Sequence, residues 1–293
     1  MFIADSQVHI WAANTPERPW RAGVHPHREV PLQVDELLRE MDAAGVNRAV
    51  LVPPYWDADR NDLVLEAARQ HPDRLAAMGR IDTDAPNARA LIANWRQQPG
   101  MLGLRFTYSL NRPQVGTALI EGRMDWLWEE AGKAGVPIML VVPHALVHLI
   151  DRVAERHPAL RLVMSHLALT SGKKDEEAFR ELDKLLVIAK RPNVAVKASA
   201  LPAYTNDRYP YRRLHPYLRR VYDAFGPRRI FWGTDLARLP CSYRQAVTMF
   251  TEEIPWLTAE DKEWIMGRGL CEWIGWKLPA ASQPVGLNSP TGC

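Results

Sequence analysis

The stretch MDWLWEEAGKAGVPIMLVV, residues 124–142, contains the pattern that decides the fold. Its first half has apolar residues at helical spacing and ends at Ala134-Gly135, where the glycine stops the helix. Its second half is the apolar run Pro137 to Val142, which has the length of a buried strand. A helix followed at once by a buried strand is the repeating unit of a parallel sheet covered by helices.

The same unit recurs along the whole chain. Eight strands are predicted, at Phe2–His9, Arg48–Val52, Leu75–Ile81, Met101–Phe106, Pro137–Val142, Arg161–His166, Asn193–Ala198 and Arg229–Gly233. The helices predicted to follow them are Val34–Ala44, Asn61–His71, Asn87–Trp95, Met124–Ala134, Leu146–His157, Glu177–Lys190, Tyr211–Phe225 and Ser242–Glu253. Eight units with short connections predict an α/β fold of the (β/α)8 TIM-barrel type, because an open sheet would leave edge strands. No G-x-G-x-x-G follows the first strand, so a dinucleotide-binding fold has no support.

The domain organisation follows from the length of 293 residues, which suits one barrel of about 250 residues. We expect a single domain over residues 1–278, with Thr258–Trp276 as a short helical C-terminal extension. Residues 279–293 are rich in Ser, Pro and Gly and predict a flexible tail. Three longer connections follow strands, so we expect them at the catalytic face of the barrel: Trp11–Leu32, Thr107–Arg123 and Ser199–Pro210.

Composition and charge exclude several classes of protein. Hydrophobic residues make up 47% and charged residues 24%, which is typical of a globular chain. The 37 basic and 34 acidic residues are interleaved, so nucleic acid is not an expected partner. The longest apolar run, 136–142, is too short to span a bilayer, and no leader pattern begins the chain. Cys241, Cys271 and Cys293 match no disulfide or zinc spacing, so we expect a cytoplasmic protein.

Polar side chains interrupt the apolar strands near their carboxyl ends, where barrel enzymes place their reactive groups. They are Asp5, Gln7, His9, Arg80, Asp82, Arg105, His166, Lys197 and Asp235. We expect these groups to converge on one pocket that binds a small anionic substrate. His144 is interpreted as a loop residue. No chemical role is assigned to His25, His27, His71, His148, His157 or His215.

Five segments carry a resemblance to a known family. In chain order they are DSQVHIW (5–11), GLRF (103–106), VMSHL (163–167), NVAVK (193–197) and FWGTD (231–235). Together they resemble the amidohydrolase-related (amidohydrolase 2) superfamily, in particular hydrolases similar to 2-pyrone-4,6-dicarboxylate lactonase. The resemblance runs from about Ile3 to Trp276 and implies an amidohydrolase-like TIM barrel.

The resemblance implies roles for three residues. Asp235 resembles the aspartate after strand eight that serves as general base towards the attacking water. His166 resembles the histidine after strand six that polarises the carbonyl or holds a metal. The same kind of role is expected for His9. The structural alternatives are a helix N-cap for Asp235 and a buried core position for each histidine.

Arg105 and Lys197 are the candidate holders of a substrate carboxylate, because a guanidinium binds a carboxylate through two hydrogen bonds and a buried lysine needs an anion nearby. The alternative for each is an internal salt bridge, with Asp5 or Asp82 as partner. The further candidates for substrate binding are Gln7, Arg80, Arg238 and Tyr108.

The strand-one motif departs from the pattern of the metal-binding relatives. They begin with D-x-H-x-H and add a histidine on strand five, whereas this chain has Gln7 and only apolar side chains in Ile138–Val142. We therefore expect catalysis without a tightly bound metal or other cofactor. If one divalent metal such as Zn or Mn is bound, the candidate ligands are His9, His166 and Asp235.

These observations leave three hypotheses. The first is a hydrolase of a small lactone or related cyclic ester that carries a carboxylate, with Asp235 activating water and His, Lys and Arg groups stabilising the oxyanion. The second is a metal-dependent decarboxylase of an aromatic acid. The third is a barrel that only binds or assembles, which the retained ionisable residues argue against. The aromatic residues of the loops suit a planar ring but could equally pack a lid or a homo-oligomer contact: Trp11, Trp20, Tyr55, Trp56, Tyr108, Tyr204, Tyr209 and Tyr211.

Overall fold

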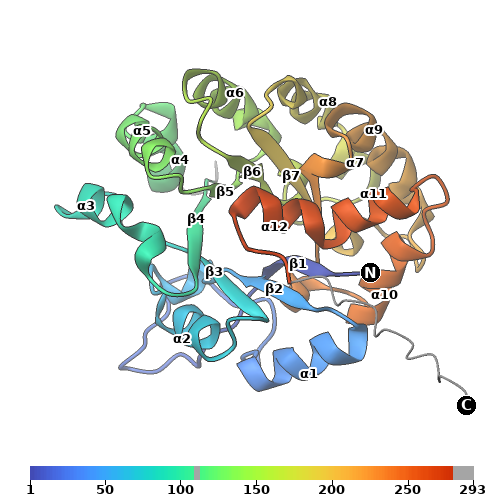
Figure 1. Cartoon of the computed structure of the whole chain (residues 1–293), viewed down its shortest axis with the longest axis horizontal. Helices are drawn as coiled ribbons and strands as arrows, with labels where there is room; N and C mark the ends of the chain where they lie inside the picture. The colour runs from blue at the N-terminus through green and yellow to red at the C-terminus, as the bar shows by residue number, and fades with distance from the viewer. Residues whose placement is uncertain (109–112, 280–293) are drawn as a thin grey trace, which may run out of the picture.

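The computed structural model describes residues 1–108 and 113–279 and contains eight strands in one parallel sheet. The strands are β1 (Ala4–Val8), β2 (Arg48–Leu51), β3 (Leu75–Gly79), β4 (Met101–Thr107), β5 (Ile138–Val141), β6 (Leu162–Met164), β7 (Val194–Ser199) and β8 (Ile230–Gly233). Each strand pairs in parallel with the next one in sequence, and helices surround them (Figure 1). The predicted TIM barrel is therefore confirmed.

The helices largely follow the predicted pattern. They are α1 (Val34–Ala44), α2 (Asp62–Gln70), α3 (Ala88–Ala93), α4 (Pro113–Ile120), α5 (Asp125–Lys133), α6 (Val147–Arg156), α7 (Asp175–Phe179), α8 (Leu182–Leu186), α9 (His215–Phe225), α10 (Tyr243–Thr251), α11 (Ala259–Glu263) and α12 (Gly269–Ile274). The helix predicted at Glu177–Lys190 is in fact α7, α8 and a 3-10 turn at Val187–Lys190. Helix α4 lies within a connection that was not predicted to be helical, because Gly116 and Thr117 are poor helix formers.

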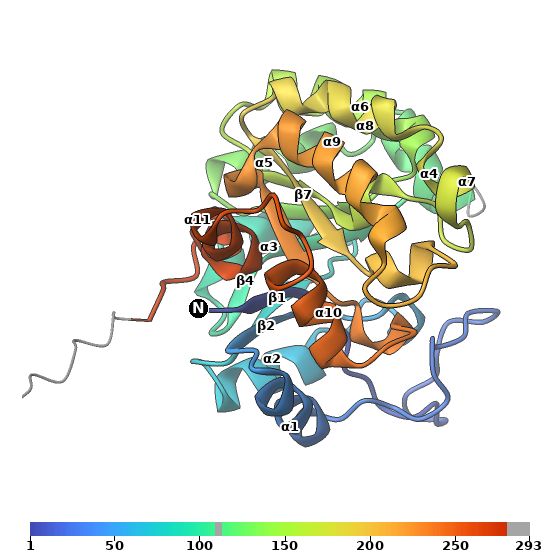
Figure 2. The ribbon, with the colours of Figure 1, turned by 90° about the vertical axis from the view of Figure 1, so that its right-hand side faces the viewer.

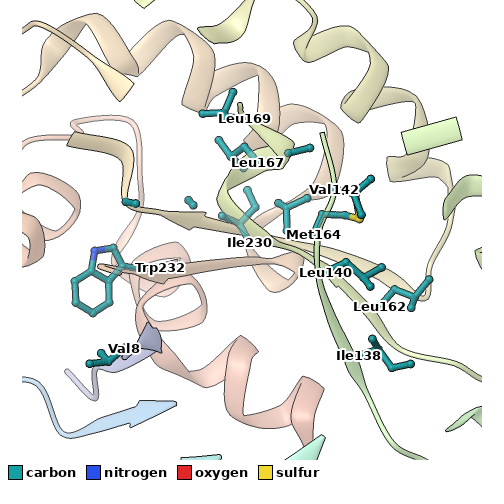
Figure 3. Packing of buried hydrophobic residues seen from close by; sticks show 14 of the residues in the cluster. Val8, Ile138, Leu140, Val142, Leu162, Met164, Leu167, Leu169, Ile230 and Trp232 are labelled. Carbon is teal, nitrogen blue, oxygen red and sulfur yellow. The ribbon is translucent and has the colours of Figure 1, made fainter. Parts of the chain in front are cut away.

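Strand side chains alternate between two apolar layers. On β5, Ile138 and Leu140 belong to the outer layer between strands and helices, whereas Met139 belongs to the barrel interior. Figure 3 shows part of the outer layer, where Leu162 and Met164 of β6 lie near the β5 side chains. Polar residues that replace apolar ones on inward positions must therefore lie inside the barrel or at its mouth.

The barrel closes between β8 and β1 through groups at the ends of these strands. The Asp235 N–H donates to the Gln7 carbonyl at 2.9 Å. The Asp5 carboxylate accepts hydrogen bonds from the Thr234 N–H at 2.9 Å, the Thr234 hydroxyl at 2.5 Å and the Tyr243 hydroxyl at 2.8 Å. A side chain at Gly233 would lie 2.3 Å from the Ser6 hydroxyl, so this seam requires glycine. Asp5 is therefore a structural residue of the seam, and it forms no salt bridge with Arg105 or Lys197.

The helical extension covers the amino-terminal end of the barrel. Leu270, Cys271 and Ile274 of α12 pack in the same apolar cluster as the interior strand residues. In Figure 1, α12 crosses in front of the strands. In Figure 2, the dark red C-terminal helices lie at one end of the barrel, and the blue connection after β1 lies at the other. The tail predicted at 279–293 lies, apart from Pro279, outside the described residues. No helix in the described part of the chain is both long and apolar enough to cross a membrane.

Candidate active site

A cavity of about 490 Å³ opens at the carboxyl ends of the strands. This volume is typical of sites for small molecules. The cavity is lined by many residues predicted for the site: Gln7, His9, Arg80, Arg105, Tyr108, His166, Asp235 and Arg238. Three others lie elsewhere. Asp5 is buried in the seam between β8 and β1. Asp82 is exposed beside a neighbouring hollow, and Lys197 is buried behind the cavity wall.

Asp235 is the buried carboxylate of the cavity and directly follows β8. Its Oδ1 lies 3.2 Å from Nε2 of His9, and its Oδ2 lies 3.7 Å from Nε2 of His166. Burial alone would raise its pKa, but the contact with His9 and the charges around it hold the pKa well below its usual value. Asp235 precedes a short 3-10 turn without a capping hydrogen bond from its side chain. Its carboxylate is therefore ionised and directed at the imidazoles instead of serving as an N-cap.

Hydrogen-bond partners at Nδ1 hold both imidazoles in place. His9 Nδ1 donates to the Val52 carbonyl at 2.6 Å, and His166 Nδ1 lies 2.9 Å from the Ser199 hydroxyl. His166 and Asp235 have left-handed backbones, with φ of 54° and 52°. Such conformations are uncommon for residues other than glycine and tend to cluster at functional sites.

Arg105 is a buried cation without an acidic partner. Its Nη1 donates to the Ser165 hydroxyl at 2.6 Å, and its Nε has no hydrogen-bond partner. Among the described residues, no carboxylate forms an ion pair with it. Burial and the nearby Arg80 lower the pKa of its guanidinium to about 9. An anion bound in the cavity would stabilise this charge.

The other cations also lie on the cavity wall. Arg238 Nη1 lies 3.4 Å from Asp235 Oδ2, and Arg80 donates to the Pro53 carbonyl at 3.1 Å. The lining residues include three arginines and one carboxylate, so the cavity has a positive balance. The buried Tyr108 hydroxyl has no hydrogen-bond partner among the described residues and is available to a ligand.

Lys197 lies one side chain away from the cavity. Its Nζ is fully buried, donates to Gln7 Oε1 at 2.5 Å and contacts the Ser6 carbonyl at 3.4 Å. Because Gln7 stands between this amino group and the cavity, any effect of Lys197 on a bound anion must pass through Gln7 or through its charge.

The donor set does not fit a tightly bound divalent metal. Gln7 Nε2 lies 3.4 Å from Nε2 of His9 and 3.3 Å from Nε2 of His166. Amide hydrogens therefore face the space between the two imidazoles, and an amide nitrogen is a poor ligand. Behind it lies the amino group of Lys197, which repels a cation when protonated. In the described part of the chain, no group of three or more His, Cys, Asp or Glu side chains forms a metal site.

Sequence reasoning missed several residues of the cavity, notably His25 and His27 in the connection after β1. His27 packs edge-on against Trp56 at 5.1 Å between ring centroids, and Trp56 also contacts His9 at 5.9 Å. The available signal was their place in a long connection that follows a strand. His144 lies outside the cavity, buried, with Nε2 3.0 Å from the Leu167 carbonyl.

The chain is similar to curated lactone hydrolases. It is 26% identical to the L-fucono-1,5-lactonase of Burkholderia ambifaria over 257 residues, which cover 80% of each protein. It is 25% identical to the 4-sulfomuconolactone hydrolase of Hydrogenophaga intermedia over 207 residues, which cover 69% of this chain and 64% of that protein.

The fold is shared with solved structures. An amidohydrolase of Burkholderia multivorans with bound zinc superposes with a TM-score of 0.75 at 20% identity, covering 94% of this chain and 99% of that one. The sequence also matches the family described as Amidohydrolase over residues 4–268, which is most of its length. The chain therefore belongs to the amidohydrolase family and is an enzyme of the hydrolase class.

Proposed function

We propose that this enzyme hydrolyses a small lactone or related cyclic ester that carries a carboxylate. The observation that carries the proposal is the buried Asp235 carboxylate, which faces two imidazoles inside a cavity of positive balance. A carboxylate in this setting stays ionised and can accept a proton at neutral pH. The similarity to two lactone hydrolases supports hydrolysis of a lactone.

The reaction then needs one water molecule and no redox step. Asp235 takes a proton from the water while the water oxygen attacks the lactone carbonyl carbon. The carbonyl oxygen becomes an oxyanion, which the surrounding His and Arg groups stabilise, with Lys197 acting through Gln7. When the ring C–O bond breaks, the proton on Asp235 passes to the leaving ring oxygen. The product is the open hydroxy acid, and Asp235 is ionised again.

Arg105 is the proposed partner of the substrate carboxylate. Its unpaired guanidinium lies on the cavity wall, with Arg80 and Arg238 as further cations. The aromatic rings of Trp56, Tyr108 and Tyr204 also line the cavity and suit the faces of a ring substrate. The substrate class that fits is therefore a small lactone or cyclic ester with a negatively charged carboxylate.

The alternative is decarboxylation of an aromatic acid with the help of a divalent metal. That chemistry needs the metal site that Gln7 and the apolar β5 side chains replace. A Zn or Mn ion on His9, His166 and Asp235 would have to displace the Gln7 amide. The donor set therefore favours hydrolysis.

The test is a substrate screen with purified enzyme. The panel contains L-fucono-1,5-lactone, 4-sulfomuconolactone, other lactones with and without a carboxylate, and hydroxybenzoic acids. Each is assayed after chelation and again with added Zn²⁺ or Mn²⁺. We expect lactone hydrolysis that survives chelation. Release of CO2 from an aromatic acid, restored by metal, would replace the proposal with the alternative.

A further inference from the structure

Gln7 lies on β1 at the wall of the cavity, and the contacts of its side chain fix the orientation of the amide. Lys197 Nζ carries hydrogens in either protonation state, and two carbonyl oxygens accept from it, Oε1 of Gln7 and the main-chain oxygen of Ser6. The amide oxygen therefore faces Lys197. The amide NH2 group must face the opposite way, towards the imidazoles and the cavity.

His166 holds one hydrogen of this NH2 group. Its Nε2 lies 3.3 Å from Gln7 Nε2, so it accepts that hydrogen if it is unprotonated. On the other side of the ring, Nδ1 has the Ser199 hydroxyl at 2.9 Å and the Ser199 carbonyl at 3.4 Å. The hydroxyl can donate or accept, so Ser199 leaves the tautomer undecided. The orientation of Gln7 decides it and assigns the proton to Nδ1.

The second hydrogen of the amide has only a long contact, which a substrate oxygen can replace. It faces Nε2 of His9 at 3.4 Å, but that nitrogen is closer to Asp235 Oδ1, at 3.2 Å. Because the Val52 carbonyl fixes the proton on His9 Nδ1, the His9 ring is also fixed in orientation. Gln7 lines the cavity together with Asp235, so this N–H can exchange its long contact with His9 for a shorter hydrogen bond to a substrate oxygen.

We propose that Gln7 is a catalytic residue whose side-chain N–H binds the lactone carbonyl oxygen as it becomes an oxyanion, and that Lys197 and His166 position it. Lys197 holds the amide oxygen, and His166 holds one amide hydrogen. The remaining N–H then stabilises the negative charge that develops on the carbonyl oxygen. This role rests on the proposed lactone hydrolysis, whereas the orientation of the amide does not.

The orientation is tested by NMR of protein with ¹⁵N-labelled histidine, with the His166 and His9 resonances assigned from single His→Gln variants. In the wild type we expect His166 with protonated Nδ1 and unprotonated Nε2. Gln7→Glu keeps an acceptor for Lys197 but removes the N–H, so His166 Nε2 should gain the proton. His9 Nδ1 should stay protonated and serves as the internal control. Ser199→Ala should leave the His166 tautomer unchanged. A protonated neutral Nε2 of His166 in the wild type would overturn the arrangement.

The catalytic role is tested by kinetics on the lactone that the wild type hydrolyses. Loss of an oxyanion-binding amide costs about 10²- to 10³-fold in kcat, so Gln7→Glu and Gln7→Met should both lose this much with little change in KM. Lys197→Met should lose about 10- to 100-fold, as is typical when a positioning partner is removed. The double variant Lys197→Met, Gln7→Met should be no worse than Gln7→Met alone.

The kinetics test the catalytic role of Gln7, and the NMR tests the orientation of its amide. A kcat within about 3-fold of the wild type in both Gln7 variants, a difference below 1 kcal/mol, would remove Gln7 from catalysis even if lactones are substrates. If no lactone is hydrolysed, the catalytic role fails together with the proposed function, while the NMR result still shows whether Lys197 and His166 hold the amide. Thermal unfolding of each variant confirms that the kinetics report on folded protein.

Discussion

Two buried aspartates belong to neighbouring strands, Asp5 inside β1 and Asp235 just after β8, and they differ in the hydrogen bonds that their oxygen atoms accept. Asp5 accepts four hydrogen bonds, from the Thr234 N–H and hydroxyl, the Tyr243 hydroxyl and the Gln7 N–H. Asp235 is just as buried, yet its Oδ1 forms no hydrogen bond among the described residues, although His9 lies close. Burial therefore does not separate a structural carboxylate from a reactive one, whereas unused acceptor capacity does.

The pKa values of the two groups differ in the same sense. Burial raises the pKa of Asp5 to about 6, because its neighbours donate hydrogen bonds but bring no full positive charge into contact. The contact with His9 and the charges of His9 and Arg238 hold the pKa of Asp235 well below its usual value, although burial acts in the opposite direction. The seam thus tolerates a proton on its aspartate, while the cavity keeps its aspartate ionised.

The strongest test of this comparison is Asp235→Asn. The amide cannot accept the proton that the attacking water loses, so kcat should fall by about 10²- to 10⁴-fold. The melting temperature should fall only modestly, because the amide keeps the size of the carboxylate but loses its charged contacts with His9 and Arg238. Steady-state kinetics and thermal unfolding measure the two effects. A variant that keeps most of its kcat would remove Asp235 from the role of base.

Asp5→Ala should show the opposite pattern. Removing the carboxylate leaves the Thr234 and Tyr243 donors buried and unpaired, so the free energy of unfolding should fall by about 2–4 kcal/mol. The kcat of the folded fraction should change less than 10-fold, a difference of about 1.4 kcal/mol or less. Denaturant unfolding followed by fluorescence gives the stability. A large loss of kcat at unchanged stability would mean that both aspartates belong to the catalytic machinery.

Arg105→Met separates substrate binding from structure. In the wild type, the buried Arg105 guanidinium has no acidic partner among the described residues, so it can bind the substrate carboxylate. Its loss in the variant should raise KM for a carboxylate-bearing lactone by about 10-fold, or about 1.4 kcal/mol, with a smaller change in kcat. A neutral lactone of similar size is the matched control and should lose little. Equal losses on both substrates would indicate that Arg105 only supports the barrel through Ser165.

The smallest expected effect is a pH dependence of stability from Asp5. Its pKa is about 6 in the folded protein, against an ordinary value of 3.8 for an aspartate exposed to water, so the folded state binds this proton more tightly. The contribution of Asp5 is therefore fully present below about pH 4 and is lost as the pH rises through 6. The stability difference between wild type and Asp5→Ala should shrink over this window, by about 1 kcal/mol or more. A difference that grows with pH would mean that Asp5 is stabilised as the anion.

Much of the fold and part of the site could be predicted from the sequence, because apolar strands and helix breakers are local signals. Asp235, His166 and Arg105 could be found because each interrupts or ends an apolar run. The role of Asp5 could not, since its donors, Thr234 and Tyr243, are more than 200 residues away and meet it only when the barrel closes.

The sequence also did not show how close to the mouth of the barrel a strand side chain lies. Alternation places both Arg105 and Lys197 inside the barrel, but it does not tell which one reaches the mouth and which one stays beneath Gln7. His27 could not be located, because a long connection without regular structure has no periodicity from which its path can be inferred.

The position of α12 has a consequence for the order in which the barrel is completed during synthesis. Leu270, Cys271 and Ile274 complete the interior cluster, and the ribosome releases them after all eight strands, because α12 follows β8 in the sequence. Until they emerge, the amino-terminal ends of the strands have no cover, and the interior side chains of β1 to β8 stay open to water. A nascent chain, or one truncated before residue 258, therefore presents the apolar surface that chaperones bind and that drives aggregation.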